Sequence, residues 1–229
     1  MTDTIKIDLH MHTCASKDGV LHPAAIIKEA KQRGLDRICI TDHNTIAGAR
    51  VAHKIDPEFV IVGEEIKIDR GCEILAFFVQ ERVPPGLSAQ ETINRLQAQG
   101  AVISVSHPFD PHRNQPWTEE WLEAVLPGLD AIEAFNARTI RARDNDKARA
   151  FAAAHNLPVT AGSDAHTARE IGVAYLEMPI FTTAAEFRAA LPQATIHGRL
   201  SPPWVHLFSP LNMWRGRFGL KPSVSDNWP

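Results

Sequence analysis

The stretch Ile5-Lys6-Ile7-Asp8-Leu9-His10-Met11-His12 decides how this chain is interpreted. Its first five residues form the short, apolar and β-branched run that is typical of a strand. His10 and His12 follow directly, and side chains two residues apart in an extended segment point to the same side. The sequence therefore predicts a strand at residues 5–9 whose end presents two imidazoles to one point.

The same arrangement of an apolar run with ligand-type residues at its end recurs along the chain. Five further runs, at residues 37–41, 59–62, 102–105, 131–135 and 158–161, are predicted as strands. The ligand-type residues that follow them or lie within them are Asp42 and His43, Glu64 and Glu65, His107, Glu133 and Asn136, and Asp164 and His166. Because the carboxyl ends of parallel strands meet at one rim, we expect these side chains to converge. Imidazole and carboxylate are ligands of divalent transition metals, so the sequence predicts a site for two or three ions.

The segments between these runs decide the fold class. Helices are predicted at residues 23–33, 45–53, 88–99, 119–125, 140–155 and 184–191, and two more strands at 73–79 and 173–178. Arg70-Gly71 is a turn signal, which indicates a hairpin or two adjacent strands around it. The repeated order of strand then helix predicts an α/β fold, with a mostly parallel sheet that is covered by helices and able to close into a barrel.

Length and composition place this sheet in one large domain. The chain has 229 residues, a formal net charge of −3 and 44% hydrophobic residues, which are ordinary values for a globular protein. We expect one domain over residues 1–200 and a Pro- and Trp-rich tail over residues 201–229 that forms an irregular extension. The slightly acidic balance argues against a broadly basic surface for nucleic acid.

Membrane-bound and secreted classes of protein are not expected. No apolar run reaches the roughly 20 residues that cross a bilayer, and the first residues lack the basic and apolar segments of a secretory signal. The three cysteines, Cys14, Cys39 and Cys72, do not make a disulfide framework, and Cys14 is interpreted as a loop residue rather than a metal ligand. We therefore expect a cytoplasmic protein with no membrane partner, and the sequence leaves its oligomeric state open.

Five motifs, taken in chain order, resemble those of the PHP (polymerase and histidinol phosphatase) family. They are Asp8-Leu9-His10-Met11-His12-Thr13 with Ser16-Lys17-Asp18-Gly19, Thr41-Asp42-His43-Asn44-Thr45, Gly63-Glu64-Glu65-Ile66, His107-Pro108 and Gly162-Ser163-Asp164-Ala165-His166. The resemblance extends over about residues 5–191 and is greatest to the stand-alone, metal-dependent phosphoesterases of the family. It implies a distorted, seven-stranded (β/α)7 barrel that is TIM-like, followed by the irregular tail.

The family resemblance also implies a set of metal ligands. One ion would be held by His10, His12, Glu65 and Asp164. Glu65 would bridge to a second ion shared with His107, and a third ion would be held by Asp18, His43 and His166. Some family members supply a further histidine near residues 131–135, where this sequence has Glu133 and Asn136. We therefore expect two or three Mn²⁺, Fe²⁺ or Zn²⁺ ions, and the oxygen ligand at Asp18 favours Mn²⁺ or Fe²⁺.

A chain of this kind is expected to hydrolyse phosphate monoesters with a metal-bound hydroxide. The expected partner is a small phosphorylated substrate, which includes nucleotides, RNA ends and related small phosphoesters. Asp42 and His43 are the candidates for the group that protonates the leaving oxygen. Arg138 is the expected phosphate clamp, with Arg169 as another candidate, because arginine binds phosphate in a bidentate manner.

Two other functions remain open at this point. A 5′→3′ exonuclease on short RNA or DNA would need a basic groove, and the Arg-rich segment at residues 138–149 offers one, although the acidic net charge disfavours it. A non-catalytic metal scaffold would use the same ligands only to stabilise the fold. Manganese-dependent release of phosphate from a panel of esters distinguishes these functions.

Overall fold

One curved, nearly closed sheet organises the fold. The computed structural model describes residues 3–113, 115–218, 220–222 and 224. The strands are β1 (Thr4–Asp8), β2 (Arg37–Ile40), β3 (Val60–Lys67), β4 (Glu73–Phe77), β5 (Val102–Val105), β6 (Ala131–Asn136), β7 (Val159–Gly162), β8 (Ala174–Pro179) and β9 (Thr195–Gly198). Their order is β7-β6-β5-β4-β3-β2-β1-β8-β9. The α/β class is confirmed, but the prediction of seven strands is wrong, because the sheet has nine within the described residues.

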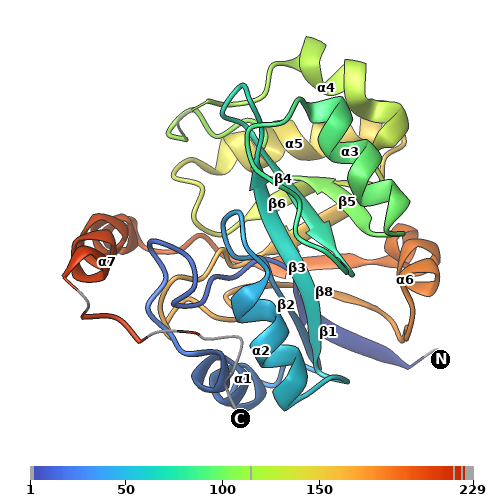
Figure 1. The fold of residues 1–229 in the computed structure, drawn as a ribbon. Helices are drawn as coiled ribbons and strands as arrows, with labels where there is room; N and C mark the ends of the chain where they lie inside the picture. Colours follow the sequence, from blue (N-terminus) through green and yellow to red (C-terminus); the bar gives the residue numbers. More distant parts are fainter. Residues whose placement is uncertain (1–2, 114, 219, 223, 225–229) are drawn as a thin grey trace.

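Helices lie on the outside of the sheet (Figure 1). They are α1 (Pro23–Gln32), α2 (Ala47–Ile55), α3 (Ala89–Ala98), α4 (Glu119–Val125), α5 (Ala142–Ala154), α6 (Ala184–Ala190) and α7 (Phe208–Arg217), with 3-10 turns η1 (Leu126–Gly128), η2 (Leu191–Gln193) and η3 (Pro203–Leu207). Local signals set their ends: the Ser88 hydroxyl caps α3 by accepting a hydrogen bond from the Glu91 amide at 3.2 Å. In the part of the chain that is described, no helix has the length and apolar character that a bilayer span requires.

The sheet is more antiparallel than the sequence predicts. β1, β2 and β3 are parallel to one another, as are β5, β6 and β7, but β4 runs antiparallel to both β3 and β5. β8 is antiparallel to β1, and it pairs with β9, a strand that the sequence analysis does not anticipate. The turn at Arg70-Gly71 explains β4, because a short hairpin loop leaves no residues for the crossover that a parallel strand needs.

The segments that follow β1 and β7 meet, although these two strands are not neighbours in the sheet. Met11 and Ala165 form an isolated parallel bridge, the His12 amide donates to the Ala165 carbonyl at 2.8 Å, and the Asp164 amide donates to the His10 carbonyl at 2.7 Å. The Asp8 carboxylate fixes this junction by accepting from the Ser163 amide at 2.9 Å. The loops that carry the first and last predicted motifs therefore lie side by side.

Alternation along the segment after β1 separates the core from the candidate site. Met11 is fully buried and packs in a cluster with Ile38 and Ile40, between the sheet and α1. His10 and His12, on either side of it, point to the opposite face, as the i and i+2 spacing predicts. The hydrophobic cluster thus holds the backbone that presents both imidazoles.

The C-terminal tail was expected to be irregular, but it contains η3 and α7. Two of its prolines are compatible with these elements, since Pro203 begins η3 and Pro210 lies in the first turn of α7. Backbone N–H groups in a first turn have no hydrogen-bond partner within the helix, so a proline there removes no helical hydrogen bond. Val205 is 1% exposed, so the tail packs against the domain. Figure 1 shows α7 beside the loop that follows β1.

Candidate metal centre

The loops after β1 and β7 bring His10, His12 and Asp164 to one buried point. The two imidazoles are 0% exposed, and their Nε2 atoms lie 3.6 and 3.2 Å from Asp164 Oδ1. Gly162 permits this approach, since a Cβ there would lie 2.3 Å from the Cβ of His10. The juxtaposition that the strand ends predicted is therefore present.

Glu65 lies at the centre of the cluster and contacts four imidazoles. Its Oε1 atom is 3.4 Å from His10 Nε2 and 3.2 Å from His107 Nε2. Its Oε2 atom is 3.5 Å from His12 Nε2 and 2.9 Å from His43 Nδ1. A carboxylate in this position has the geometry that a bridge between two ions requires. The structure places Glu65 within β3 rather than after its end, and an isolated bridge pairs it with His43.

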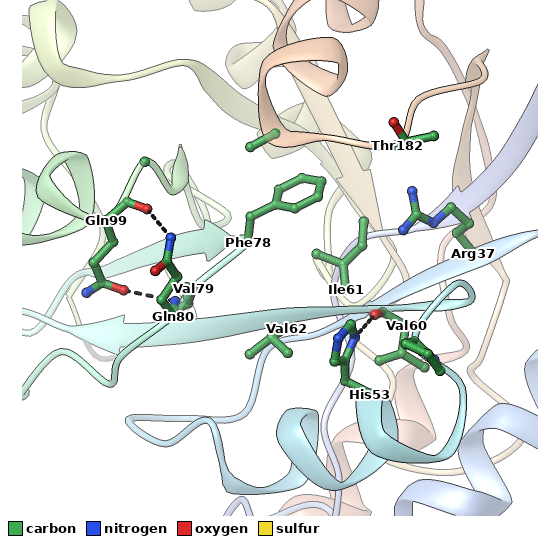
Figure 2. Close-up of a pocket in the computed structure, with 13 residues that line it drawn as sticks. Arg37, His53, Val60, Ile61, Val62, Phe78, Val79, Gln80, Gln99 and Thr182 are labelled. Carbon is green, nitrogen blue, oxygen red and sulfur yellow. Dashed lines mark hydrogen bonds between the residues drawn. The ribbon is translucent and has the colours of Figure 1, made fainter.

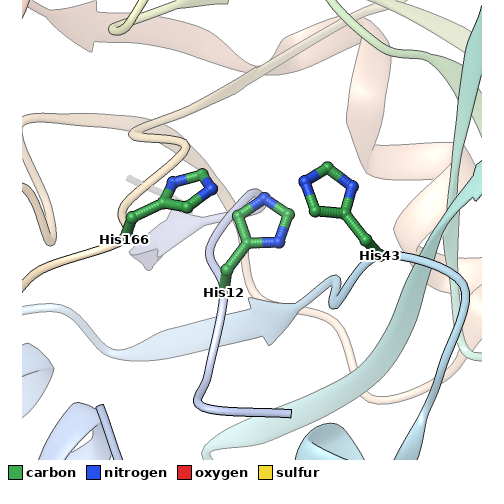
Figure 3. A group of neighbouring side chains, drawn as sticks. All are labelled: His12, His43 and His166. Carbon is green, nitrogen blue, oxygen red and sulfur yellow. The ribbon is translucent and has the colours of Figure 1, made fainter. Parts of the chain in front are cut away.

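Asp18, His43 and His166 form a second group beside the first. Asp18 Oδ2 is 3.2 Å from His166 Nε2 and 3.5 Å from His43 Nε2. Figure 3 shows His12 between the other two rings, with centroid distances of 4.4 Å to His43 and 4.3 Å to His166. The three imidazoles could share one ion. His12 thus connects the two groups of predicted ligands.

Glu73 belongs to the cluster but was not predicted. Its carboxylate lies 3.5 Å from His107 Nε2 and 3.6 Å from His43 Nδ1. Ligands were expected at the ends of strands, whereas Glu73 is the first residue of β4. Because β4 is antiparallel to its neighbours, its first residue lies at the rim where the parallel strands end. The turn signal at Arg70-Gly71, followed directly by an acidic residue, is the pattern that could have revealed it.

Glu133 contacts the candidate ligands His10 and His107 on the side away from the centre of the cluster. Its Oε1 atom is 2.8 Å from His10 Nδ1, and its Oε2 atom accepts from the His107 amide at 2.7 Å and from Asn136 Nδ2 at 3.1 Å. Asn136 Nδ2 also lies 3.2 Å from Asp164 Oδ2. A carboxylate on the far nitrogen of a ligand histidine fixes the tautomer and the orientation of the ring. Glu133 and Asn136 therefore orient other side chains.

Asp42 has a similar position behind the loop at residues 13–16. One oxygen accepts from the Thr13 amide at 2.7 Å and the Ser16 hydroxyl at 2.9 Å, and the other accepts from the Thr13 hydroxyl at 2.7 Å. Burial raises the pKa of Asp42 and the hydrogen bonds from Thr13 oppose this. This geometry favours a role in holding the loop over the proton transfer for which Asp42 was one of two candidates, with His43.

Arg138, the predicted phosphate clamp, is buried and bonded to other groups. Its Nη1 atom donates to Glu170 Oε1 at 3.0 Å, and Nη2 donates to the Val205 carbonyl at 3.5 Å. Arg113, which the sequence analysis missed, is the guanidinium that contacts the cluster, through a short hydrogen bond to Asp164 Oδ2. Arg113 lies in the loop after His107, where no spacing rule singles it out.

Three other histidines have partners outside the cluster. His22 caps α1 by accepting from the Ala24 amide, His53 Nδ1 lies 2.7 Å from the Val60 carbonyl, and His197 stacks on Tyr175. A separate hollow of about 390 Å³ lies near His53, with Arg37, Ile61, Phe78 and Thr182 also in its lining (Figure 2). Arg37 and Val60 begin β2 and β3, so this hollow lies at the end of the sheet away from the cluster.

The electrostatics of the cluster favour ionised carboxylates beside a neutral His12. Burial lowers the pKa of His12, and His166 and His43 add to this, so that it falls to about 3. Burial opposes ionisation of Glu65, but His10 and His43 outweigh this effect and hold its pKa well below the ordinary value. Burial also opposes ionisation of Asp164, but Arg113 and His10 outweigh this effect and hold the pKa of Asp164 well below the ordinary value. These are the protonation states in which His12 and the carboxylates bind metals. At His10 and His43, burial favours the neutral ring, but the neighbouring carboxylates outweigh it and raise the pKa of both imidazoles well above the ordinary value, so a bound cation has to displace their protons.

The donor atoms that face the centre of the cluster fit a metal ion. Five of the buried side-chain atoms that have no hydrogen-bond partner belong to the cluster: His10 Nε2, His12 Nε2, Asp18 Oδ1, Glu65 Oε2 and Asp164 Oδ1. Leaving such atoms unpaired in a protein interior costs about 1–3 kcal/mol each, so five together indicate that another group completes them. Nitrogen and carboxylate oxygen donors at this density are typical of a divalent transition metal site.

Comparison with known proteins agrees with the motifs. The PHP domain matches residues 8–142, and a PHP-associated domain matches residues 142–196. The chain is 39% identical over 147 residues to an uncharacterised protein of Methanocaldococcus jannaschii. The matched region covers 58% of this chain and 82% of that protein. It is 28% identical over 198 residues to a protein of Escherichia coli O81 (strain ED1a) named probable phosphatase YcdX, covering 72% of this chain and 80% of the other.

A solved structure shares the fold. A Bifidobacterium adolescentis protein, described as a candidate metal-dependent phosphoesterase, superposes with a TM-score of 0.60 at 22% identity, over 70% of this chain and 87% of the other. The family match extends over more than half of the chain and shows its class. The chain belongs to the PHP-domain family.

Proposed function

We propose that this protein hydrolyses phosphate monoesters of small molecules, nucleotides or related phosphoesters, at a centre of two or three divalent transition metal ions. The observation that carries the proposal is the position of Glu65, whose carboxylate contacts His10, His12, His43 and His107 within 3.5 Å. Such a bridging carboxylate is of use where two ions act on one phosphoryl group.

The geometry supports three groups of ligands. His10, His12, Glu65 and Asp164 would hold one ion, and Glu65, Glu73 and His107 a second. Asp18, His43 and His166 would hold a third. Mn²⁺ and Fe²⁺ suit these sets better than Zn²⁺, because carboxylate oxygens make up a large part of the donors.

The charge of the cluster supports at least two ions. Its carboxylates are those of Asp18, Glu65, Glu73, Glu133 and Asp164, and its permanent cation is Arg113. When the imidazoles are neutral, five carboxylates and one guanidinium leave four negative charges, which two divalent ions balance. Buried charge without such compensation is strongly destabilising, so the carboxylates favour metal binding over an empty centre.

The reaction then divides between the ions and the side chains around them. Bound ions would lower the pKa of a water molecule that attacks phosphorus and would neutralise charge on the phosphoryl oxygens. Arg113 is positioned to bind the phosphate, because its guanidinium lies against Asp164 and its side chain is 23% exposed. His43 has a carboxylate at each ring nitrogen, so we assign it to metal binding. Asp42 and Arg138 would hold the loops that carry these groups.

Phosphate release from a substrate panel tests the proposal. The protein is purified without chelator, its metal content is measured, and mononucleotides, sugar phosphates and 5′-phosphorylated oligonucleotides are supplied with Mn²⁺. We expect more than one equivalent of transition metal and turnover of the small monoesters, with loss of activity in Asp164→Ala but not in the control Asp146→Ala on exposed α5. Near-zero metal, or full turnover by Asp164→Ala, would refute the proposal. Activity restricted to oligonucleotides would assign the site to an exonuclease instead.

A further inference from the structure

The C-terminal tail reaches the candidate centre at the loop that carries Asp18. Asn212 on α7 is 2% exposed, whereas its neighbours Leu211 and Met213 are 46% and 38% exposed. Asn212 is thus the residue that α7 turns toward the domain at this point. The tail follows residues 8–196, which match the family models, so it is not among the parts that define the family.

The tail bonds three consecutive backbone carbonyls of that loop. Asn212 Nδ2 donates to the Asp18 carbonyl at 2.9 Å, and Lys221 Nζ donates to the carbonyls of Ser16 at 2.7 Å and Lys17 at 2.9 Å. Gly216 allows the Lys221 side chain to cross α7 closely, because a Cβ there would lie 3.1 Å from Lys221 Cδ. An amide and an ammonium from the tail therefore fix the backbone of residues 16–18.

One of these carbonyls belongs to Asp18, whose side chain is part of the cluster. Asp18 Oδ2 lies 3.2 Å from His166 Nε2, and Asp18 Oδ1 is a buried atom without a partner. The loop lies outside the helices and strands, so contacts with other segments set where the Asp18 carboxylate points. A hydrogen bond to the Asp18 carbonyl therefore acts on the backbone of the same residue that carries the candidate ligand atoms.

The tail also touches the site at a second point. The Val205 carbonyl accepts from Arg138 Nη2 at 3.5 Å, and this arginine is joined to Glu170. Glu170 Oε2 in turn accepts from the His166 amide at 3.3 Å. Both contacts of the tail therefore lead to ligands of the same group, Asp18 and His166.

We propose that the C-terminal tail is a positioning element of the metal centre, in which Asn212 and Lys221 hold the Asp18 loop so that Asp18, His43 and His166 bind their ion. The inference rests on the proposed function, because it requires that this group of side chains binds a metal. Asn212 and Lys221 are positioning residues, since neither contacts the ion or the substrate. Outer-shell groups of this kind change metal affinity by about 10- to 100-fold.

Manganese titration of the full chain tests the inference. Asn212→Leu keeps the volume of the side chain and removes the amide that donates to the Asp18 carbonyl. Lys221→Met likewise removes the ammonium that donates to the Ser16 and Lys17 carbonyls. Leu211→Ala is the matched control on the same helix as Asn212. Calorimetric Mn²⁺ binding and metal content are measured for each, with circular dichroism and Tm to confirm folding. We expect Asn212→Leu and Lys221→Met to weaken one Mn²⁺ site about tenfold or more and to leave the others unchanged, as Leu211→Ala leaves all of them.

A double-mutant cycle with Asp18→Asn identifies the ion that is affected. If the tail acts through Asp18, Asn212→Leu in the Asp18→Asn background will cause no further loss of Mn²⁺ affinity. Folded Asn212→Leu and Lys221→Met variants with unchanged Mn²⁺ affinity would overturn the inference, as would a full additional loss in the double variant. Should Asn212→Leu not fold, Lys221→Met and its own cycle decide the question. A wild-type protein that binds no Mn²⁺ would instead refute the proposed function, which is a distinguishable outcome.

Discussion

Replacing Glu133 by glutamine tests whether the centre depends on groups that do not face the metal. Glu133 accepts hydrogen bonds at both oxygens, from His10 Nδ1 at 2.8 Å and from the His107 amide at 2.7 Å. Glutamine has nearly the same size but only one accepting atom, so one of these two donors loses its partner. Both donors are buried and cannot turn to solvent instead.

The size of the effect follows from these contacts. A hydrogen bond to a charged group contributes about 1.5–3 kcal/mol, and every 1.4 kcal/mol is a factor of ten in an equilibrium constant. Glu133→Gln should therefore weaken metal binding by about 10- to 100-fold, in agreement with what outer-shell carboxylates contribute elsewhere. His10 is predicted to ligate the first ion and His107 the second, so the site whose donor loses its partner should be the one that is weakened.

Calorimetric titration with Mn²⁺ measures this change directly, and phosphate release at saturating Mn²⁺ reports whether activity returns. Glu123→Gln on the exposed face of α4 removes the same charge far from the cluster and serves as the control. Recovery of activity at high Mn²⁺ would show that Glu133 acts on metal affinity. Mn²⁺ affinity within twofold of wild type in a folded Glu133→Gln variant would refute the argument that His10 and His107 need this carboxylate.

Three other substitutions give separate expectations. Glu65→Gln should lower both Mn²⁺ affinity and phosphate release by more than tenfold, because it removes the charge that four imidazoles share; an unchanged Mn²⁺ titration would contradict this. Arg113→Lys should raise the KM for a phosphate ester by about tenfold while metal content stays the same, since lysine cannot bind phosphate in a bidentate manner. Burial raises the pKa of Glu64 to about 7, so the folded state loses stability relative to the unfolded chain as pH rises from about 4.5 through 7. In urea unfolding with chelator, Glu64→Gln should match wild type near pH 4.5 and be more stable by up to about 3 kcal/mol at pH 8, and a difference independent of pH would be evidence against the effect.

The ligands at the ends of parallel strands could be predicted because two local rules coincide there. Residues i and i+2 share a face in an extended segment, and the ends of parallel strands share a rim. These rules were enough to place His10, His12, His107 and Asp164 together. They do not depend on the number of strands, so these side chains lie together although the sheet has nine strands instead of seven within the described residues.

Glu73 and Arg113 could not be found in this way, for physical reasons. Strand direction is a property of pairing between distant segments, and only the antiparallel course of β4 brings its first residue to the rim. Arg113 lies in a loop whose position depends on packing rather than on a repeat. The helix α7 was missed because the prolines of the tail suggest irregular structure, although Pro210 in the first turn of α7 is compatible with a helix.

Two kinds of buried carboxylate occur at the candidate site, and the difference between them explains why a precise site can form on loops. The carboxylates of Glu65 and Asp164 each have one oxygen without a hydrogen-bond partner, which is what a cation ligand requires. Those of Asp8, Asp42 and Glu133 instead accept hydrogen bonds from backbone amides, of Ser163, Thr13 and His107 respectively. Each of the second kind joins one strand end to a different one, because its donor lies far away in the sequence. The ligand loops are therefore fixed to one another by charge-assisted hydrogen bonds, which are about twice as strong as neutral ones, rather than by the regular pairing of the sheet.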